Sequence, residues 1–172
     1  MPRIARVVVP RCPHHVTQRG TNRGDILLDQ EDREYFLDCL ADWLPRARVE
    51  NWAYCLMTNH FHLLLVPQDL VGLGKCLHGV TFRYAQYFNG KYHRSGRLWQ
   101  NRFFSCPVDL STHLWIVARY IERNPVRAGI VAQPEAWLWS MREPISVANQ
   151  IGSRLVLIGS PVIGTDKSTH AL

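Results

Sequence analysis

Several features that mark common protein classes are missing from this sequence. No apolar run approaches the roughly 20 residues that a membrane-spanning helix needs, and the first residues hold no long apolar stretch of the kind found in secretion signals. The five cysteines are scattered and odd in number, with no CxxC pair. This argues against a disulfide framework and against a cysteine zinc site. We therefore expect a cytosolic protein with no membrane partner.

Acidic residues are also in the minority. The 20 Lys and Arg residues outnumber the 14 Asp and Glu residues, which gives a net charge of +6 and a pI near 9.3. This charge suits a polyanionic partner, although charge alone does not name one. Hydrophobic residues make up 47% of the chain and charged residues 20%, a globular composition. A chain of 172 residues is long enough for one domain with a core, or for a domain with a tail.

The spacing of apolar residues predicts alternating strands and helices. We expect strands at 14–19, 51–57, 60–66 and 98–108, and helices that begin after Asp29, span 73–88, and run from Ser111 to about Arg123. Strand–helix–strand, twice over one antiparallel sheet, is the ferredoxin-like arrangement of the α+β class. Clear periodicity stops after Trp139, so we assign the domain to residues 1–142 and treat 143–172 as a divergent tail.

Residues 57–67, MTNHFHLLLVP, place two histidines inside an apolar run. Successive side chains of a strand face opposite sides, so His60 and His62 would share one face with Leu64. Phe61 would lie on the other face, in the core. Imidazoles at this spacing can swing together and hold one cation. Taken alone, however, the motif is more often a hydrogen-bonded pair on a half-buried strand.

Residues 119–129, RYIERNPVRAG, supply a further feature. Tyr120 and Asn124 are four residues apart, which places them on one face of a helix. Pro125 disfavours the helical conformation at Asn124, so we expect the helix to end there and leave the carboxamide oxygen free to face an ion. Arg127 would lie near the same face, where it could contact a phosphate or cap the carbonyls of the preceding helix. Taken alone, Tyr120 would be an ordinary surface tyrosine.

Together these residues suit phosphodiester transfer. A metal ion polarises the scissile phosphate and neutralises its developing charge. A tyrosine hydroxyl can attack phosphorus and keep the energy of the bond in a phosphotyrosine link. Two imidazoles and one amide oxygen form a mixed ligand set that suits Mg²⁺ or Mn²⁺. The set lacks the closed four-ligand shell of structural zinc.

Four blocks of the sequence resemble the REP-associated tyrosine transposases, a branch of the single-tyrosine HUH transposases (His, hydrophobic, His). These blocks are HHVTQRGTNR, MTNHFHLLL, GRLWQNRFFSCPV and RYIERNPVRAGIV, which together cover roughly residues 10 to 140. The resemblance implies the HUH type of ferredoxin-like fold, with His60 and His62 as metal ligands and Asn124 as the third. It implies that Tyr120 cleaves single-stranded DNA, leaving a 5′-phosphotyrosine bond and a free 3′-OH.

The resemblance also implies the substrate and the setting. The substrate would be a palindromic DNA hairpin with a flanking single-stranded tag, handled by a monomer or a homodimer in the bacterial cytoplasm, near the nucleoid. The resemblance ends where AWLWSMREPISVANQIG diverges after Ser140 from the family's WxWSS ending. No role is carried over to the tail.

Basic and aromatic residues are interleaved in 83–102 and around the first turn. Basic groups can contact phosphates, and aromatic faces can stack on unpaired bases. The candidate DNA contacts are Arg19, Arg23, Arg83, Lys91, Tyr92, Arg94, Arg97 and Arg102, together with Arg127. Trp99 is a further stacking candidate, but Trp99, Tyr84 and Phe88 are more simply explained as core residues. A solvated loop explains Arg19 and Arg23 equally well.

Three functions stay open on this reading. The first is a metal-dependent enzyme that nicks and rejoins single-stranded DNA. The second is a non-catalytic nucleic-acid-binding module of the same fold. The third is a metal phosphohydrolase that uses activated water and forms no covalent adduct. The joint presence of the two histidines, Tyr120 and Asn124 favours the enzyme, because a binding module has no need of a tyrosine beside a metal.

Overall fold

The computed structural model describes residues 7–110 and 112–141 of the chain. The strands are β1 (His14–Arg19), β2 (Val49–Leu56), β3 (His60–Pro67) and β4 (Phe104–Pro107). They form one antiparallel sheet in the order β2-β3-β1-β4. Helix α1 (Gln30–Ala47) connects β1 to β2, and α2 (Gly72–Lys91) connects β3 to β4. Two interleaved strand–helix–strand units therefore share one sheet, which confirms the predicted ferredoxin-like α+β fold.

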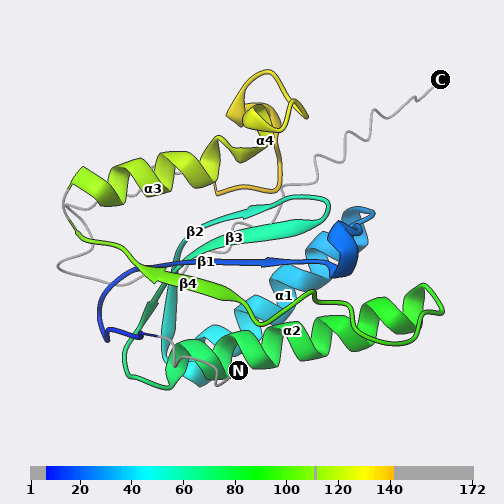
Figure 1. Ribbon diagram of the computed structural model, residues 1–172, viewed down its shortest axis with the longest axis horizontal. Coiled ribbons are helices and arrows are strands. Elements are labelled where there is room, and N and C mark those ends of the chain that lie inside the picture. Colours follow the sequence, from blue (N-terminus) through cyan, green and yellow to red (C-terminus); the bar gives the residue numbers. More distant parts are fainter. Residues whose placement is uncertain (1–6, 111, 142–172) are drawn as a thin grey trace, which may run out of the picture.

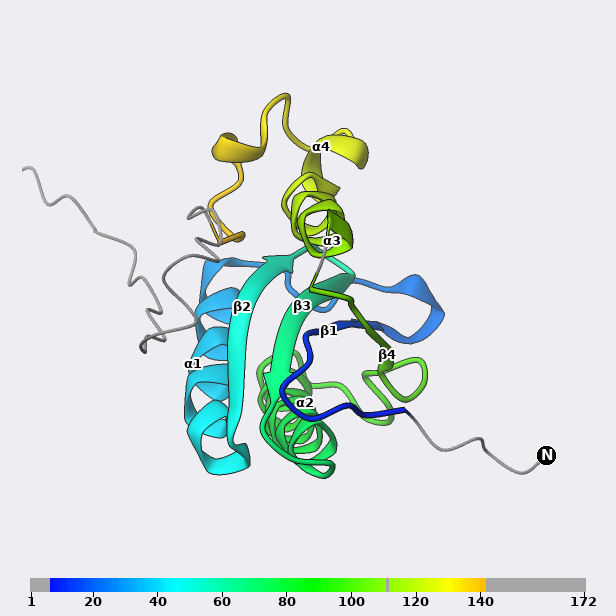
Figure 2. The same ribbon diagram turned by 90° about the vertical axis from the view of Figure 1, so that its left-hand side faces the viewer.

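The helices form a layer on each side of the sheet (Figures 1 and 2). Helices α1 and α2 cover one face, and α3 (Thr112–Glu122) with the short α4 (Asn124–Arg127) covers the other. None of the helices in the described part of the chain has both the length and the apolarity that crossing a membrane requires.

Strand β3 divides its side chains between the two layers as its alternation predicts. Phe61, Leu63 and Leu65 are buried in the core beneath α1 and α2. Leu64 belongs instead to a smaller cluster beneath α3, which includes Leu114 and Ile121. The two histidines of β3 therefore lie on the α3 side of the sheet.

Helix α1 begins where the sequence predicts. The side chain of Asp29 accepts a hydrogen bond from the backbone N–H of Asp32, and the side chain of Asp32 accepts one from the backbone of Asp29. This reciprocal capping box satisfies donors at the helix N-terminus that have no partner within the helix.

Strand β4 is much shorter than the predicted 98–108. Trp99 makes only an isolated bridge with Gly20, and its indole N–H donates to the carbonyl oxygen of Thr81 on α2. Backbone hydrogen bonds from Thr21 to Leu98 and from Gln100 to Arg19 keep this segment beside the end of β1, but the continuous strand begins only at Phe104. The predicted helix cap Ser111 and the tail from residue 143 lie outside the described residues.

The outer edge of β2 is covered by the last described residues. The backbone N–H of Leu56 donates to Trp139, and that of Met141 donates to Tyr54. Between them, Cys55 and Ser140 form an antiparallel bridge. An edge strand with unsatisfied backbone groups can pair with another chain, and this contact removes that possibility along part of β2.

Candidate functional site

The histidine pair takes its position from the pairing of β1 with β3. In this register Thr17 lies opposite His62 and Arg19 lies opposite His60, and directly opposed residues share a face of the sheet. The two imidazole centroids are 5.0 Å apart, with their planes at 80°. The rings therefore converge on the face that α3 covers.

Helix α3 brings Tyr120 over this pair. The tyrosine ring lies edge-on to the His62 ring, with centroids 5.7 Å apart. Tyr120 is 37% exposed. Asn124, at the start of α4, donates from Nδ2 to the carbonyl oxygen of Tyr120 over 2.9 Å. Asn124 lines the same cleft as Tyr120 and His62. The structure thus brings together all four residues that the sequence singled out for the reaction.

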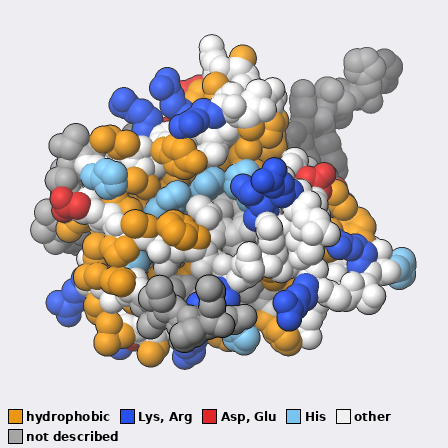
Figure 3. All heavy atoms as spheres, in the orientation of Figure 1, with side chains coloured by type: hydrophobic (Ala, Val, Ile, Leu, Met, Phe, Trp, Pro, Cys, Tyr) orange, Lys and Arg blue, Asp and Glu red, His pale blue; other side chains and the backbone are white. Residues whose placement is uncertain are grey.

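These four residues line one cleft of about 380 Å³. Arg19 and Arg102 line it as well, with Phe104 at its β4 side. In Figure 3 the histidine side chains form a row beneath the upper helical layer, with Lys and Arg side chains at one end of the row. A cleft that combines neutral nitrogen ligands, a hydroxyl and guanidinium groups suits a phosphate-containing substrate.

Both histidines of the pair are held neutral at neutral pH. Burial, with smaller contributions from the charges of His60, His15 and Arg19, lowers the pKa of His62 to about 3. Burial and Arg19 also lower the pKa of His60. Only a neutral imidazole has a lone pair to offer a metal ion.

The tautomer of His60 follows from its neighbour Asn59. The Asn59 amide donates from Nδ2 to the carbonyl oxygen of Arg23, which leaves Oδ1 as the atom 2.6 Å from His60 Nδ1. An amide oxygen only accepts, so Nδ1 of His60 carries the proton. The Nε2 lone pair of His60 is then free to bind a cation.

The residues present fit a divalent cation. Nε2 of His62 is buried and has no hydrogen-bond partner among the described residues, and buried polar atoms rarely lack one. Within residues 7–110 and 112–141, no three His, Cys, Asp or Glu side chains form a group that could hold a metal ion. Further ligands of an ion here would be oxygen atoms of other groups, and the carboxamide of Asn124 is one such group in the cleft.

Sequence reasoning missed a third histidine. Nε2 of His15 lies 2.9 Å from Nδ1 of His62. The only signal in the sequence was alternation along β1, which places His15 on the same face as Thr17 and Arg19. The register that sets β1 against β3 cannot be read from either strand alone.

The predicted DNA contacts fall into two groups. Arg19 and Arg102 line the cleft, and the guanidinium of Arg127 lies 5.1 Å from the Tyr120 ring. Arg97 and Arg102 line a second, larger cavity of about 780 Å³, which also has Phe104 in its wall. Arg23 lies in the 3₁₀ turn that follows β1. Of these five arginines, only Arg19 and Arg102 line the cleft itself.

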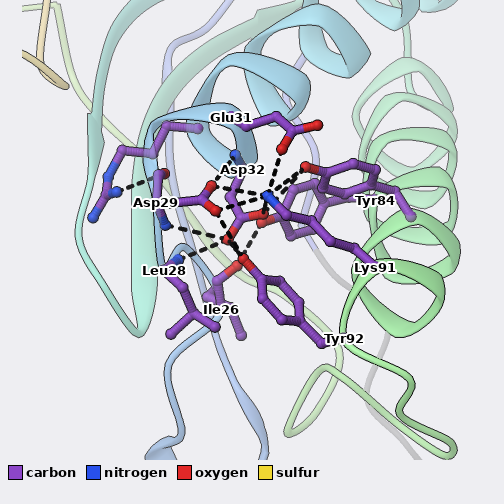
Figure 4. Close-up of polar contacts among 10 residues, drawn as sticks. Ile26, Leu28, Asp29, Glu31, Asp32, Tyr84, Lys91 and Tyr92 are labelled. Atoms are coloured by element: carbon purple, nitrogen blue, oxygen red, sulfur yellow. Dashed lines mark hydrogen bonds and ion pairs between the residues drawn. The ribbon is translucent and has the colours of Figure 1, made fainter.

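The other group lies on the α1–α2 layer. Arg83 pairs with Asp42, and Arg94 lies over the ring of Phe88. Lys91 contacts three carboxylates, and the hydroxyl of Tyr92 donates to Asp32 (Figure 4). The DNA contacts predicted for these residues stay predictions, and the carboxylate partners of Lys91 favour a structural role. Tyr84 and Phe88 are buried in the core, as expected.

The family described as "Transposase IS200 like" matches residues 8–124. No curated protein sequence matches the chain significantly. A structure described as a REP-associated tyrosine transposase bound to a REP hairpin superposes with a TM-score of 0.69 and 17% identity, covering 91% of this chain and 100% of that one. A putative transposase from Deinococcus radiodurans R1 gives a TM-score of 0.47 and 23% identity, over 71% of this chain and 97% of the other.

Proposed function

This chain belongs to the IS200-like transposase family, and from that premise we propose that it cleaves and rejoins single-stranded DNA through Tyr120. Membership of the family indicates a DNA-cleaving enzyme of the transposition type. The observation that carries the finer proposal is the position of the Tyr120 ring, 5.7 Å from the ring of His62, inside a cleft that Arg19 and Arg102 also line.

The reaction exchanges one phosphodiester for another. The hydroxyl oxygen of Tyr120 forms a bond to phosphorus, and the bond from phosphorus to the 3′ oxygen of the preceding nucleotide breaks. The tyrosine hydroxyl loses its proton to solvent, and the departing 3′ oxygen takes up one proton from solvent to become a 3′-OH. Attack by a 3′-OH on the 5′-phosphotyrosine reverses the step and frees the tyrosine, so rejoining needs no outside energy.

The ligands of a divalent ion would be Nε2 of His60, Nε2 of His62 and the carboxamide oxygen of Asn124. When bound, Mg²⁺ or Mn²⁺ would supply Lewis-acid polarisation of the scissile phosphate. Arg19 and Arg102 add fixed positive charge to the walls of the cleft. Charge held in place before the reaction stabilises charge that develops during it.

We propose that the substrate is a DNA hairpin with a single-stranded flank. This is the substrate expected for the REP-associated branch of the family. The structure of one protein with this fold contains a bound REP hairpin. In the present chain Phe104 is 61% exposed and borders both cavities. A solvent-facing aromatic ring next to Arg102 suits an unpaired base and its phosphate, and such stacking is worth about 1–3 kcal/mol per base.

The site is formed within one chain, so we propose that Tyr120 acts on DNA held by the histidines of its own chain. Mixing two inactive variants, Tyr120→Phe and His62→Gln, tests this. A mixture that stays inactive supports the single-chain site. Recovery of about a quarter or more of the wild-type activity would show that a dimer supplies the tyrosine across its interface, as expected for random pairing of two subunits.

The proposed reaction is tested by incubating the protein with Mn²⁺ and labelled single-stranded hairpin oligonucleotides from the repeats of its own genome. On a denaturing gel we expect label that migrates with the protein, and its loss in Tyr120→Phe. Cut DNA that persists in Tyr120→Phe would indicate a water-using phosphohydrolase. Tight hairpin binding without cleavage by the wild type would indicate the non-catalytic binding module.

A further inference from the structure

His15 contacts both of the groups that the reaction needs, yet no role above uses it. Its Nε2 atom lies 2.9 Å from Nδ1 of His62. The two imidazole planes are within 14° of parallel, with centroids 5.2 Å apart. The His15 ring also meets the Tyr120 ring edge-on, at a centroid distance of 5.9 Å.

The contact is built into the sheet. His15 is directly opposite Leu64, and Thr17 is directly opposite His62, so His15 and His62 are diagonal neighbours on one face. Diagonal neighbours in a sheet are within reach of long or aromatic side chains. Because both residues lie in paired strands, the hydrogen bond is present before any ligand arrives, and it does not depend on a loop.

The two ring nitrogens of His62 have different surroundings. Nδ1 faces His15, whereas Nε2 is buried with no hydrogen-bond partner in the described part of the chain. A neutral imidazole carries one proton. If that proton were on Nε2, a buried donor would have no acceptor. If it is on Nδ1, it is donated to Nε2 of His15, and the lone pair of His62 Nε2 is left facing the cleft.

We propose that His15 is a positioning residue that keeps the proton of His62 on Nδ1 and so presents the Nε2 lone pair to a metal ion. Histidine ligands usually donate their second nitrogen to an acceptor in this way, and loss of that acceptor commonly weakens metal binding by about 10- to 100-fold. The metal part of this inference rests on the proposed function. The tautomer part does not.

Three substitutions separate the hydrogen bond from the packing. His15→Phe keeps a flat ring against His62 and removes the nitrogen. His15→Gln places an amide oxygen at nearly the reach of Nε2. His15→Asn keeps the amide but is one methylene too short, and it serves as a second loss variant if His15→Phe does not fold. His78→Gln, at an exposed histidine of α2, is the matched control.

The primary measurement is the ¹⁵N chemical shifts of the His62 ring nitrogens in the metal-free protein. We expect a single Nδ1–H tautomer in the wild type, in His15→Gln and in His78→Gln, and a mixture or the Nε2–H form in His15→Phe and His15→Asn. Calorimetric titration with Mn²⁺ alone should then show a Kd raised about 10- to 100-fold in the two loss variants and within about 3-fold of wild type in His15→Gln.

Two results would overturn the proposal. One is a His62 that keeps the Nδ1–H tautomer when His15 is phenylalanine or asparagine. The other is a His15→Gln variant that behaves like the loss variants, since the ring itself and not its acceptor would then matter. If the wild type shows the expected tautomers but binds no Mn²⁺, the metal in the proposed function fails, while the role of His15 in holding the His62 proton stands.

Discussion

The two faces of the central sheet are built from different kinds of residue. Under α1 and α2, side chains such as Val16, Phe61 and Leu63 are fully buried and apolar. Under α3, the same two strands present Thr17 and His62, and only a smaller apolar cluster closes that side. Along β1 and β3, successive side chains therefore alternate between residues that stabilise the fold and residues that form the cleft.

The two faces also differ in how their polar groups are satisfied. At the α1–α2 side, Asp32 is 0% exposed and accepts hydrogen bonds from Lys91, Tyr87 and Tyr92 (Figure 4). At the α3 side, Nε2 of His62 has no such partner among the described residues. It is one of five buried side-chain atoms without a hydrogen-bond partner in the described part of the chain, and Nε of Arg33 on α1 is another. Two of the five, on Gln18 and His62, belong to residues that line the cleft, which is where a bound ligand could satisfy them.

The largest expected effect is on DNA cleavage, from a change on the face of the sheet under α3. His62→Gln should lower the rate of DNA cleavage about 1,000-fold or more, because it removes one of the two nitrogen ligands proposed for a metal that would stabilise the charge of the transition state. Thermal unfolding should change little, since the residue leaves the main core intact. Single-turnover cleavage assays and a melting curve on the same sample measure both. Cleavage near the wild-type rate would remove His62 from the reaction.

The neighbouring residue should show the opposite pattern. Phe61→Ala empties a fully buried site between α1, α2 and the sheet, and should lower the free energy of unfolding by about 3–5 kcal/mol. At a temperature where the variant is still folded, DNA cleavage should stay within a few fold of wild type. Urea denaturation measures the first quantity. A loss below about 1 kcal/mol would mean that this side of the sheet is not the main core.

The buried carboxylate of Asp32 gives the next effect. Asp32→Asn keeps the shape but removes the charge that accepts from Lys91 and two tyrosines, and should cost roughly 2–3 kcal/mol of unfolding free energy. Glu31→Gln, at a side chain that is 70% exposed, is the control and should change stability by less than about 0.5 kcal/mol. Equal effects from the two variants would contradict a structural role for the buried member of this cluster.

The free energy of unfolding should depend on pH through the imidazole of His62. The folded-state pKa of His62 is about 3, below the usual value of 6.5, so protonation favours the unfolded chain. Its contribution to stability is complete above about pH 6.5 and is lost as the pH falls toward 3. Without metal, we expect the free energy of unfolding to drop roughly 1–2 kcal/mol between pH 7 and pH 5. The drop should be smaller in His62→Gln, and an equal drop in both proteins would contradict this origin.

The smallest effect should be on DNA affinity. Arg102→Ala removes a charge from the wall of the cleft and should weaken binding of a single-stranded oligonucleotide about 5- to 10-fold, with a shallower salt dependence. Arg83→Ala tests the contact predicted for the other layer, where that guanidinium pairs with Asp42; if DNA binds mainly in the cleft, this variant should change affinity less than about 2-fold. Fluorescence anisotropy at several salt concentrations distinguishes the two. A larger loss in Arg83→Ala would mean that DNA binds the α1–α2 side.

Local patterns predicted the fold well. Alternation in MTNHFHLLLVP assigned His60 and Phe61 to opposite faces, and the capping pattern at Asp29 located the start of α1. The four-residue spacing of Tyr120 and Asn124 placed both on one side of a helix. In each case a short stretch of chain carries its own geometric signal.

What the sequence could not predict depends on residues far apart in the chain. The contact of His15 with His62 depends on the register between two strands. The DNA contacts predicted for Lys91 and Tyr92 stay predictions, but the sequence did not show that carboxylates at the start of α1 bind both side chains. The start of β4 was predicted at residue 98, but Trp99 makes only an isolated bridge and donates to Thr81 on α2, and the continuous strand begins at Phe104. Long-range packing decided these points, and local propensity did not.

The most direct test of the account is to identify the residue that becomes attached to DNA. The wild-type protein would be reacted with a hairpin oligonucleotide and Mn²⁺, digested with trypsin and nuclease, and analysed by mass spectrometry. We predict a nucleotide 5′-phosphate on the peptide that contains Tyr120, together with a DNA product that ends in a 3′-OH. An adduct on any other residue, or cut DNA without an adduct, would contradict the claim that Tyr120 on the α3 face of the sheet carries the reaction.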